Sequence, residues 1–280
     1  MKLIRFGRVG MEKPGVEING KKLDCSAHFS DWNHDFFQND GLKKLSALLA
    51  SQELPEIAEG SRFGSPIARP NMIICVGLNY SDHAKESGMD IPKEPIVFMK
   101  ATSTMVGPND TVKLPKNHSK VDWEVELGVI IGQNALYLES EEQARAHIAG
   151  YSVVHDISER AFQLERGGQW VKGKSCPGFN PVGPYLVTKD EIENVSNLNL
   201  RLKVNGKLMQ DGNTKSMIFN PIFIVWYLSQ FMQLEAGDLI CTGTPPGVGM
   251  GQNPPTFLKG GDMVELSVEG LGTQKQKFTE

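Results

Sequence analysis

The feature that most constrains this chain is a series of short apolar runs separated by turn-forming residues. Runs this short that are rich in β-branched and aromatic side chains are typical of strands rather than of helices. Because strand and helix patterns do not alternate regularly, a doubly wound fold is less expected than an α+β fold that is mostly antiparallel β with a few covering helices. We expect strands over residues 72–77, 96–99, 125–131, 150–154, 184–187, 239–242 and 263–268.

Two Asn-Gly pairs predict tight hairpins. Asn19-Gly20 lies between short strand-like segments near the N-terminus, and Asn205-Gly206 ends a regular apolar–polar alternation. Asparagine and glycine both tolerate the positive φ angles of a type I′ turn. We therefore expect each pair to join two neighbouring antiparallel strands.

Three segments carry helix signals. Residues 42–51 form one, and Ser140 can cap a second, in which Gln143 completes a capping box and Gly150 is the expected stop. Asn220-Pro221 begins an apolar third helix.

A linker near residue 70 divides the chain in two. The segment 53–69 is polar and contains proline and glycine, as linkers commonly do. We predict a small β-rich N-terminal domain over residues 1–69 and a larger domain over residues 70–280.

The composition indicates a soluble globular protein. Apolar residues make up 40% of the chain and charged residues 22%, and the net charge of −4 includes no basic stripe, so nucleic acid is not an expected partner. The longest apolar run, residues 222–228, is much shorter than the ~20 residues that span a bilayer, so we expect no membrane partner. Four dispersed cysteines and an N-terminus without an apolar signal segment favour a reducing, cytoplasmic location.

One apolar segment carries a pair of glutamates. Side chains two positions apart share a face of a strand, so Glu124 and Glu126 should point the same way, and Asp156 ends another apolar run. Three carboxylates suit a hard cation, Mg²⁺ first and Mn²⁺ or Ca²⁺ next. A solvated strand face is the alternative for the glutamates, and nearby His118 and His155 leave zinc open.

A possible base dyad follows the run 72–77. If the next residues are helical, His83 and Glu86 are neighbours on one face, where the carboxylate would raise the basicity of the imidazole. That arrangement suits a general base that activates water. An incidental surface pair is equally compatible with the spacing.

Residues 168–175 match the P-loop pattern GxxxxGK[ST]. A functional P-loop needs a hydrophobic strand before it and a helix directly after it. Polar residues precede this segment and Pro177 follows it, so nucleotide binding is the less favoured interpretation. We interpret Lys174 as a cation that faces an anionic substrate, with a surface lysine as the alternative, and Cys176 as a structural thiol.

Several motifs together resemble the fumarylacetoacetate hydrolase family. They occur in the family's order from about residue 70 to the end of the chain, which is more specific than any one motif. Other segments are most similar to the branch that contains 2,4-didehydro-3-deoxy-L-rhamnonate hydrolase, often labelled ureidoglycolate lyase; they are residues 2–7, 12–15, 162–165 and 167–175. The family motifs are Gly77-Leu78-Asn79-Tyr80 with His83 and Glu86, Glu124-Val125-Glu126-Leu127, Asp156, Lys174-Ser175 and Thr242-Gly243-Thr244-Pro245.

The resemblance implies a fold and a role for each matched residue. The implied fold is a mixed β roll with a small N-terminal domain, assembled as a homodimer. His83 with Glu86 would activate water, and Lys174 would stabilise an enolate. The implied ligands of Mg²⁺ are Glu124, Glu126 and Asp156. The residues implied to contact the carboxylate or keto oxygens of the substrate are Arg160, Gln163 and Thr244.

The implied reaction is hydrolysis of a carbon–carbon bond in a 2,4-diketo acid, which gives pyruvate and a second acid. Oxaloacetate decarboxylation, keto–enol isomerisation and ureidoglycolate cleavage use a similar keto acid or site and stay open as alternative activities. A binding module without metal dependence also stays open.

One departure from the family's motifs leaves the detailed substrate open. After Lys174-Ser175, members of the family usually carry Asp-Thr-Phe, whereas this chain has Cys176-Pro177-Gly178-Phe179.

Overall fold

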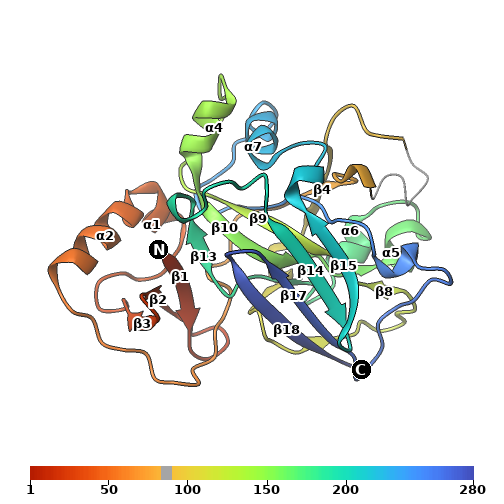
Figure 1. Cartoon of the computed structure of the whole chain (residues 1–280), viewed down its shortest axis with the longest axis horizontal. Helices are drawn as coiled ribbons and strands as arrows, with labels where there is room; N and C mark the ends of the chain where they lie inside the picture. The colour runs from red at the N-terminus through yellow and green to blue at the C-terminus, as the bar shows by residue number, and fades with distance from the viewer. Residues whose placement is uncertain (83–89) are drawn as a thin grey trace.

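A nine-stranded sheet forms the frame of the molecule (Figure 1). The computed structural model describes residues 1–82 and 90–280. The strand order across the sheet is β3-β2-β1-β13-β10-β9-β16-β4-β5. The bounds are β1 Lys2–Phe6, β2 Lys13–Ile18, β3 Lys21–Asp24, β4 Ile73–Gly77, β5 Ile96–Lys100, β9 Val125–Ile131, β10 Ile148–His155, β13 Leu186–Thr188 and β16 Leu239–Cys241.

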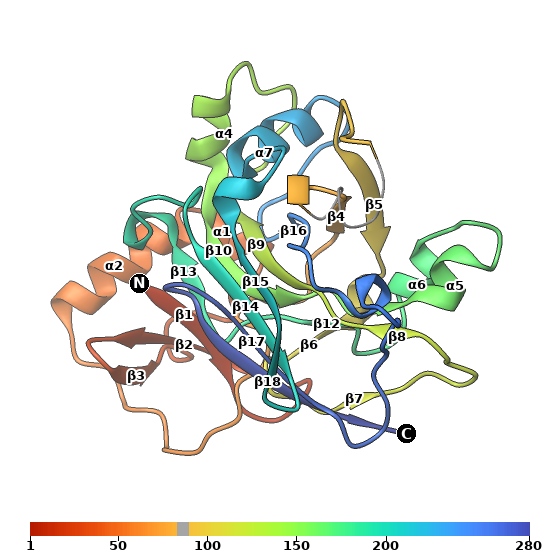
Figure 2. The ribbon, with the colours of Figure 1, turned by 45° about the vertical axis from the view of Figure 1, so that its right-hand side comes forward.

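A second sheet of five strands has the order β15-β14-β17-β18-β7. Its bounds are β7 Val112–Lys113, β14 Asn199–Val204, β15 Lys207–Asn213, β17 Met263–Val268 and β18 Gly272–Thr279. Figure 2 shows β14, β17 and β18 crossing in front of β9 and β10, and β14 and β17 contact β9. Two short pairs complete the strands, β8 (Val121–Asp122) with β11 (Ser158–Glu159) and β6 (Met105–Val106) with β12 (Asn180–Pro181).

Most neighbouring strands are antiparallel. In the described part of the chain, the parallel pairs are β4 with β16, β6 with β12 and β7 with β18. The predicted mostly antiparallel β fold with few helices is therefore confirmed.

The main core fills the space between the two sheets. Strand β9 contributes alternate residues from Val125 to Ile131, which pack with Leu200 of β14 and Leu266 of β17. All of β9 is buried, because Ile130 packs on the other face in a second core with residues of the N-terminal segment. Burial on both faces explains why this strand is a nearly continuous apolar run.

The helices cover the sheet edges and ends. Helices α4 (Glu141–His147) and α7 (Pro221–Ser229) lie side by side at the top of Figure 1. Ser140 Oγ accepts a hydrogen bond from Gln143 N (3.2 Å), which confirms the predicted cap. The predicted end at Gly150 is too late, since β10 already begins at Ile148. The other helices are α1 His34–Gln38, α2 Gly41–Ser51, α5 Arg160–Leu164, α6 Val171–Lys174, and the 3₁₀ helices η1 Thr102–Thr104, η2 Lys189–Glu191, η3 Thr214–Ser216 and η4 Gly249–Gly251.

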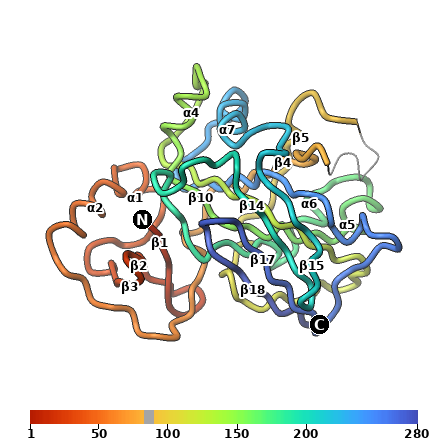
Figure 3. Tube along the Cα trace, in the orientation of Figure 1, coloured from red at the N-terminus to blue at the C-terminus, as the bar shows by residue number. Residues whose placement is uncertain are grey.

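Both hairpins are confirmed. Asn19 and Gly20 have φ angles of 50° and 79°, and Asn205 and Gly206 have φ angles of 50° and 81°, as a type I′ turn requires. Strand β1 pairs with β13 and β2, so the N-terminal segment, on the left of Figure 3, extends the large sheet. The predicted domain boundary near residue 70 stays a prediction. Within the described ranges, no helix combines the length and apolar character needed to cross a membrane.

Candidate active site

A pocket of about 440 Å³ lies beside the end of β4, the start of β9 and the end of β10, next to α5 and α6. Its lining includes every predicted site residue that the structure describes. The polar and charged lining residues are Glu124, Glu126, Asp156, Arg160, Gln163, Lys174 and Thr244. The apolar and aromatic ones are Val76, Leu78, Phe98, Leu164, Trp170, Val248 and Met250.

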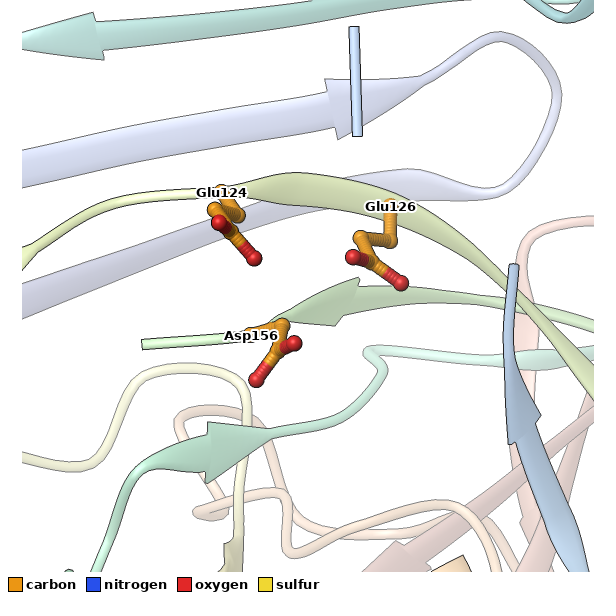
Figure 4. Close-up of side chains that lie close together, drawn as sticks. All are labelled: Glu124, Glu126 and Asp156. Atoms are coloured by element: carbon orange, nitrogen blue, oxygen red, sulfur yellow. The ribbon is translucent and has the colours of Figure 1, made fainter. Parts of the chain in front are cut away.

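Three carboxylates converge in this pocket. Glu124 lies directly before β9 and Glu126 within it, while Asp156 directly follows the antiparallel neighbour β10. The backbone N–H of Asp156 donates to the carbonyl of Glu124 (3.0 Å), which holds the two segments together. One carboxylate oxygen from each residue lies within 4.8 Å of the other two, and all three residues are buried (Figure 4). The structure thus brings together the residues predicted as metal ligands.

Buried cations hold two of these carboxylates. Lys174 Nζ donates to Glu124 Oε2 (2.7 Å) and to Asp156 Oδ2 (2.6 Å). Arg160 Nη2 donates to Glu124 Oε1 (2.6 Å). Lys100 Nζ donates to Asp156 Oδ1 and to two backbone carbonyl oxygens. Because isolated charges are costly to bury, these pairs compensate the charges that the protein encloses here.

Asp122 positions the guanidinium of Arg160. Its carboxylate accepts from Arg160 Nε (2.8 Å) and from the backbone N–H groups of Gly249 (2.6 Å) and Met250 (3.1 Å). Arg160 Nη1 donates to Gln163 Oε1 (3.1 Å). Arg160 therefore joins η4, α5 and the carboxylate cluster in one network.

Glu124 and Glu126 differ in electrostatic environment although they lie two positions apart. Burial by itself would raise the pKa of Glu124, but the charges of Lys174 and Arg160 outweigh it and hold that pKa well below its usual range. Burial, reinforced by the negative charge of Asp156, raises the pKa of Glu126 well above its usual range. Glu126 Oε2 accepts from the backbone N–H of Gly243 (2.9 Å). Lysine and arginine side chains of the described residues make no ion pair with Glu126.

This donor set fits a hard divalent cation. Carboxylate oxygens are the ligands that Mg²⁺, Mn²⁺ and Ca²⁺ prefer, and a cation would compensate the buried charge of Glu126. The histidines that left zinc open take no part in the cluster. His155 Nδ1 is hydrogen-bonded to Gln276 Oε1 (2.9 Å), and His118 Nδ1 is hydrogen-bonded to the carbonyl of Pro115 (2.8 Å).

Thr244 and Gln163, both predicted to contact the substrate, differ in their hydrogen bonds within the protein. Thr244 Oγ1 donates to the carbonyl of Val125 (2.8 Å) and accepts from Gln210 Nε2 (2.8 Å), so it fastens the loop after β16 to β9. Gln163 uses its oxygen to accept from Arg160. Within the described residues its amide nitrogen has no hydrogen-bond partner, which leaves a donor for a ligand.

Three further sequence predictions concern the base dyad, the P-loop-like segment and Cys176. His83 and Glu86 lie outside the described residues, and the base dyad stays a prediction. Helix α5 precedes the P-loop-like segment, where a functional P-loop would need a strand. Lys174 is not a surface lysine, because it is buried and contacts carboxylates. Burial raises the pKa of the Cys176 thiol to about 11, as suits a structural cysteine.

Sequence interpretation missed Lys100 and Asp122. Lys100 ends the apolar run of β5, a partly exposed strand in which Lys100 itself is buried, and a lysine directly after an apolar run is the signal that the sequence offers. Asp122 lies two positions before Glu124 and is fully buried, so the alternation of acids begins at Asp122 and continues through Glu124 and Glu126. Both residues act by holding groups that line the pocket.

Comparison with protein families identifies the chain. Residues 72–279 match the family described as fumarylacetoacetate (FAA) hydrolase C-terminal. This chain belongs to the fumarylacetoacetate hydrolase family. A relative from Burkholderia multivorans, whose name specifies only a hydrolase, is 49% identical over 278 residues that cover 99% of this chain and 98% of the relative.

Solved structures of fumarylacetoacetate hydrolase-like proteins share the whole fold. Fumarylacetoacetate hydrolase from Exiguobacterium antarcticum has a TM-score of 0.84 and 34% identity, covering 100% of this chain and 99% of that chain. Maleylpyruvate hydrolase from Sphingobium sp. SYK-6 has a TM-score of 0.80 and 27% identity, with 100% and 99% coverage. A 2-hydroxyhepta-2,4-diene-1,7-dioate isomerase from Mycobacterium marinum has a TM-score of 0.75 and 29% identity, with 100% and 98% coverage. These matches confirm the predicted fold class.

Proposed function

We propose that this chain is a Mg²⁺-dependent hydrolase that cleaves a carbon–carbon bond in a small 2,4-diketo acid. The substrate is an acylpyruvate or a 2,4-diketo-3-deoxy sugar acid, and the products are pyruvate and a second acid. The observation that carries the proposal is the buried cluster of Glu124, Glu126 and Asp156 beside Lys174 in the pocket. The hydrolase names of a relative and of two solved structures support it.

The three carboxylates would hold Mg²⁺, which supplies a Lewis acid for the carboxylate and keto oxygens of the substrate when it is bound. Lys174 contributes a fixed, buried positive charge, which stabilises negative charge that develops as the carbon–carbon bond breaks. The free amide nitrogen of Gln163 donates to a substrate oxygen. Arg160 orients both Gln163 and Glu124 through its hydrogen bonds.

Water activation is assigned to His83 with Glu86, on the strength of the family resemblance. A general base contributes ~100-fold or more to such a step. We expect His83→Ala to lower turnover by at least ~100-fold while leaving Mg²⁺ binding in place. Near-normal turnover of this variant would remove the role of His83.

The decisive experiment measures pyruvate release from a synthetic acylpyruvate in EDTA and after Mg²⁺ is restored. We expect release only with the metal. If no pyruvate appears with either Mg²⁺ or Mn²⁺, carbon–carbon hydrolysis of acylpyruvates is excluded.

Keto–enol isomerisation is the second candidate function, because matching solved structures are named as isomerases. An isomerase would change the ultraviolet spectrum of the substrate without releasing pyruvate. Product analysis of the same reaction by chromatography separates the two functions.

We also propose that the protein acts as a homodimer without a nucleic acid or membrane partner. The dimer comes from the family resemblance. The expectation of no nucleic acid partner comes from a net charge of −4 without a basic stripe, and that of no membrane partner from apolar runs much shorter than the ~20 residues that span a bilayer. Light scattering of the purified protein would test the dimer.

A further inference from the structure

We propose that Asn79, a fully buried residue just after β4, is a positioning residue that holds Glu126 in the orientation needed to bind the metal. It acts through the loop of residues 242–244, which directly follows β16. The inference rests on the proposed function, because it concerns the Mg²⁺ that the three carboxylates would hold.

The loop 242–244 is fastened to β9 at both of its ends. Thr242 donates to the carbonyl of Leu127 twice, from its backbone N–H (3.1 Å) and from its hydroxyl (2.8 Å). Thr244 Oγ1 donates to the carbonyl of Val125 (2.8 Å). The middle of the loop is therefore held opposite the residue of β9 that lies between these two carbonyls.

That middle residue, Gly243, contacts the carboxylate cluster directly. Its backbone N–H donates to Glu126 Oε2 (2.9 Å), and Glu126 lies beside Glu124 and Asp156 (Figure 4). A hydrogen bond to one oxygen restricts the rotation of the whole carboxylate, and carboxylates that bind metals are commonly oriented in this way. Buried lysine or arginine side chains orient Glu124 and Asp156, whereas a backbone donor of the loop orients Glu126.

Asn79 ties this loop to the segment that precedes α7. Its Nδ2 donates to the carbonyl of Thr242 (2.7 Å) and to the carbonyl of Phe219 (2.9 Å). Its Oδ1 accepts from the backbone N–H of Phe219 (2.8 Å), and its backbone carbonyl accepts from the N–H of Ile218 (2.8 Å). Because the side chain is fully buried, these hydrogen bonds form in a medium of low dielectric, where they are strong.

Asn79 also packs against the residue that donates to Glu126. Gly243 has a φ of 97°, in the left-handed region that favours glycine. A Cβ atom at Gly243 would lie 2.8 Å from the Cβ atom of Asn79 and 3.1 Å from the carbonyl oxygen of Val76. The loop is thus in close contact with Asn79, so a smaller side chain at position 79 should let the Gly243 N–H move relative to Glu126.

The test measures Mg²⁺ binding by isothermal titration calorimetry of the whole chain without substrate. We expect Asn79→Ala to raise the Kd for Mg²⁺ by ~10- to 100-fold, the range for groups that orient a metal ligand. Asn220→Ala is the matched control, because Asn220 also holds the start of α7, where its side chain accepts from the N–H groups of Ile222 and Phe223 (2.9 Å each). Loss of this cap should lower stability and leave the wild-type Kd.

Denaturant unfolding of the same two variants separates positioning from stability. A lower unfolding midpoint of Asn79→Ala with a wild-type Kd for Mg²⁺ would show that Asn79 is structural only and would overturn the inference, while the proposed function stands. If the wild-type protein itself binds no Mg²⁺, the proposed metal site is defeated and this inference with it.

A second variant decides the matter if Asn79→Ala does not fold. Thr242→Val keeps the shape of the side chain and removes its hydroxyl bond to Leu127, which loosens the same loop on its other side. We expect its Kd for Mg²⁺ to rise by at least ~2-fold, the scale of one net hydrogen bond. A wild-type Kd in folded Thr242→Val would contradict the role of the loop and therefore of Asn79.

Discussion

His155, the last residue of β10, and Asp156, which directly follows it, belong to two different buried polar clusters. His155 bonds to Gln276, which in turn donates to Gln274 (3.1 Å), inside the neutral core between the sheets. Asp156 bonds to Lys100 and Lys174 at the pocket. The alternation of side chains along the strand therefore separates an uncharged cluster from a charged one.

The difference shows what each cluster is for. Burial lowers the pKa of His155 to about 3, so its imidazole stays neutral near pH 7, with Nδ1 bonded to Gln276 and Nε2 without a hydrogen-bond partner among the described residues. The cluster at Asp156 contains several ionised groups, which are expensive to bury and which a stable core does not need. Charged groups gathered beside a pocket are the usual sign of a functional site. We therefore assign the first cluster to folding and the second to chemistry.

The largest expected effect comes from the charged cluster. Glu124→Ala removes a proposed metal ligand and the partner of both Lys174 and Arg160, so we expect turnover to fall by at least ~100-fold. Glu265→Ala, at a half-exposed glutamate of β17 that pairs with Lys203 outside the pocket, is the control and should keep wild-type turnover. Pyruvate release at saturating Mg²⁺ measures both variants. Near-normal turnover of Glu124→Ala would contradict the division between the clusters.

A smaller effect is expected for Lys100, whose Nζ donates to Oδ1 of Asp156. Lys100→Met keeps the length of the side chain but removes its hydrogen bonds to Asp156 and to the backbone. Groups that orient a metal ligand typically change metal affinity or activity by ~10- to 100-fold. We expect the Mg²⁺ concentration for half-maximal activity to rise by that factor, with partial recovery of turnover at high Mg²⁺. A loss of stability with an unchanged Mg²⁺ requirement would show that Lys100 is structural only.

Sequence patterns predicted the parts of the molecule that local rules determine. The type I′ hairpins follow from the Asn-Gly pairs, and strands β9 and β17 match their predicted bounds, because each is a run of residues with one preferred backbone conformation. The convergence of Glu124 and Glu126 follows from the period of a strand. These features need no knowledge of distant residues.

The parts that sequence did not predict depend on distant contacts. Lys100 meets Asp156 across 56 positions, and no local pattern encodes that pair. The end of α4 is fixed by the pairing of β10 with β9, which takes over at Ile148. Thr244 is similar, because its hydroxyl is engaged by Val125 and Gln210 from separate strands. Tertiary structure therefore decides which polar residues are free to meet a ligand.

The smallest predicted effect tests the neutral cluster through pH. The ordinary pKa of a histidine is 6.5, and the folded value of His155 is about 3, so below pH 6.5 the unfolded chain binds a proton that the folded protein does not. The stability that this histidine contributes is present above pH 6.5 and is lost as the pH falls, by about 1.4 kcal/mol per unit until the folded pKa is reached. A cation bound at Asp156 would depress the pKa of His155 further in the same direction.

His155→Gln should therefore lose that slope. Denaturant unfolding at pH 7, 6 and 5 in EDTA measures it, with His28→Gln, at an exposed position, as the control. Glu126 acts in the opposite sense, because its raised pKa makes the apo protein less stable as the pH rises above the usual carboxyl range. That contribution is shared by wild type and His155→Gln, so it cancels in the difference between their slopes. If the two slopes were equal, His155 would be protonated in the folded protein, and the neutral cluster would have to be regarded as a second charged site.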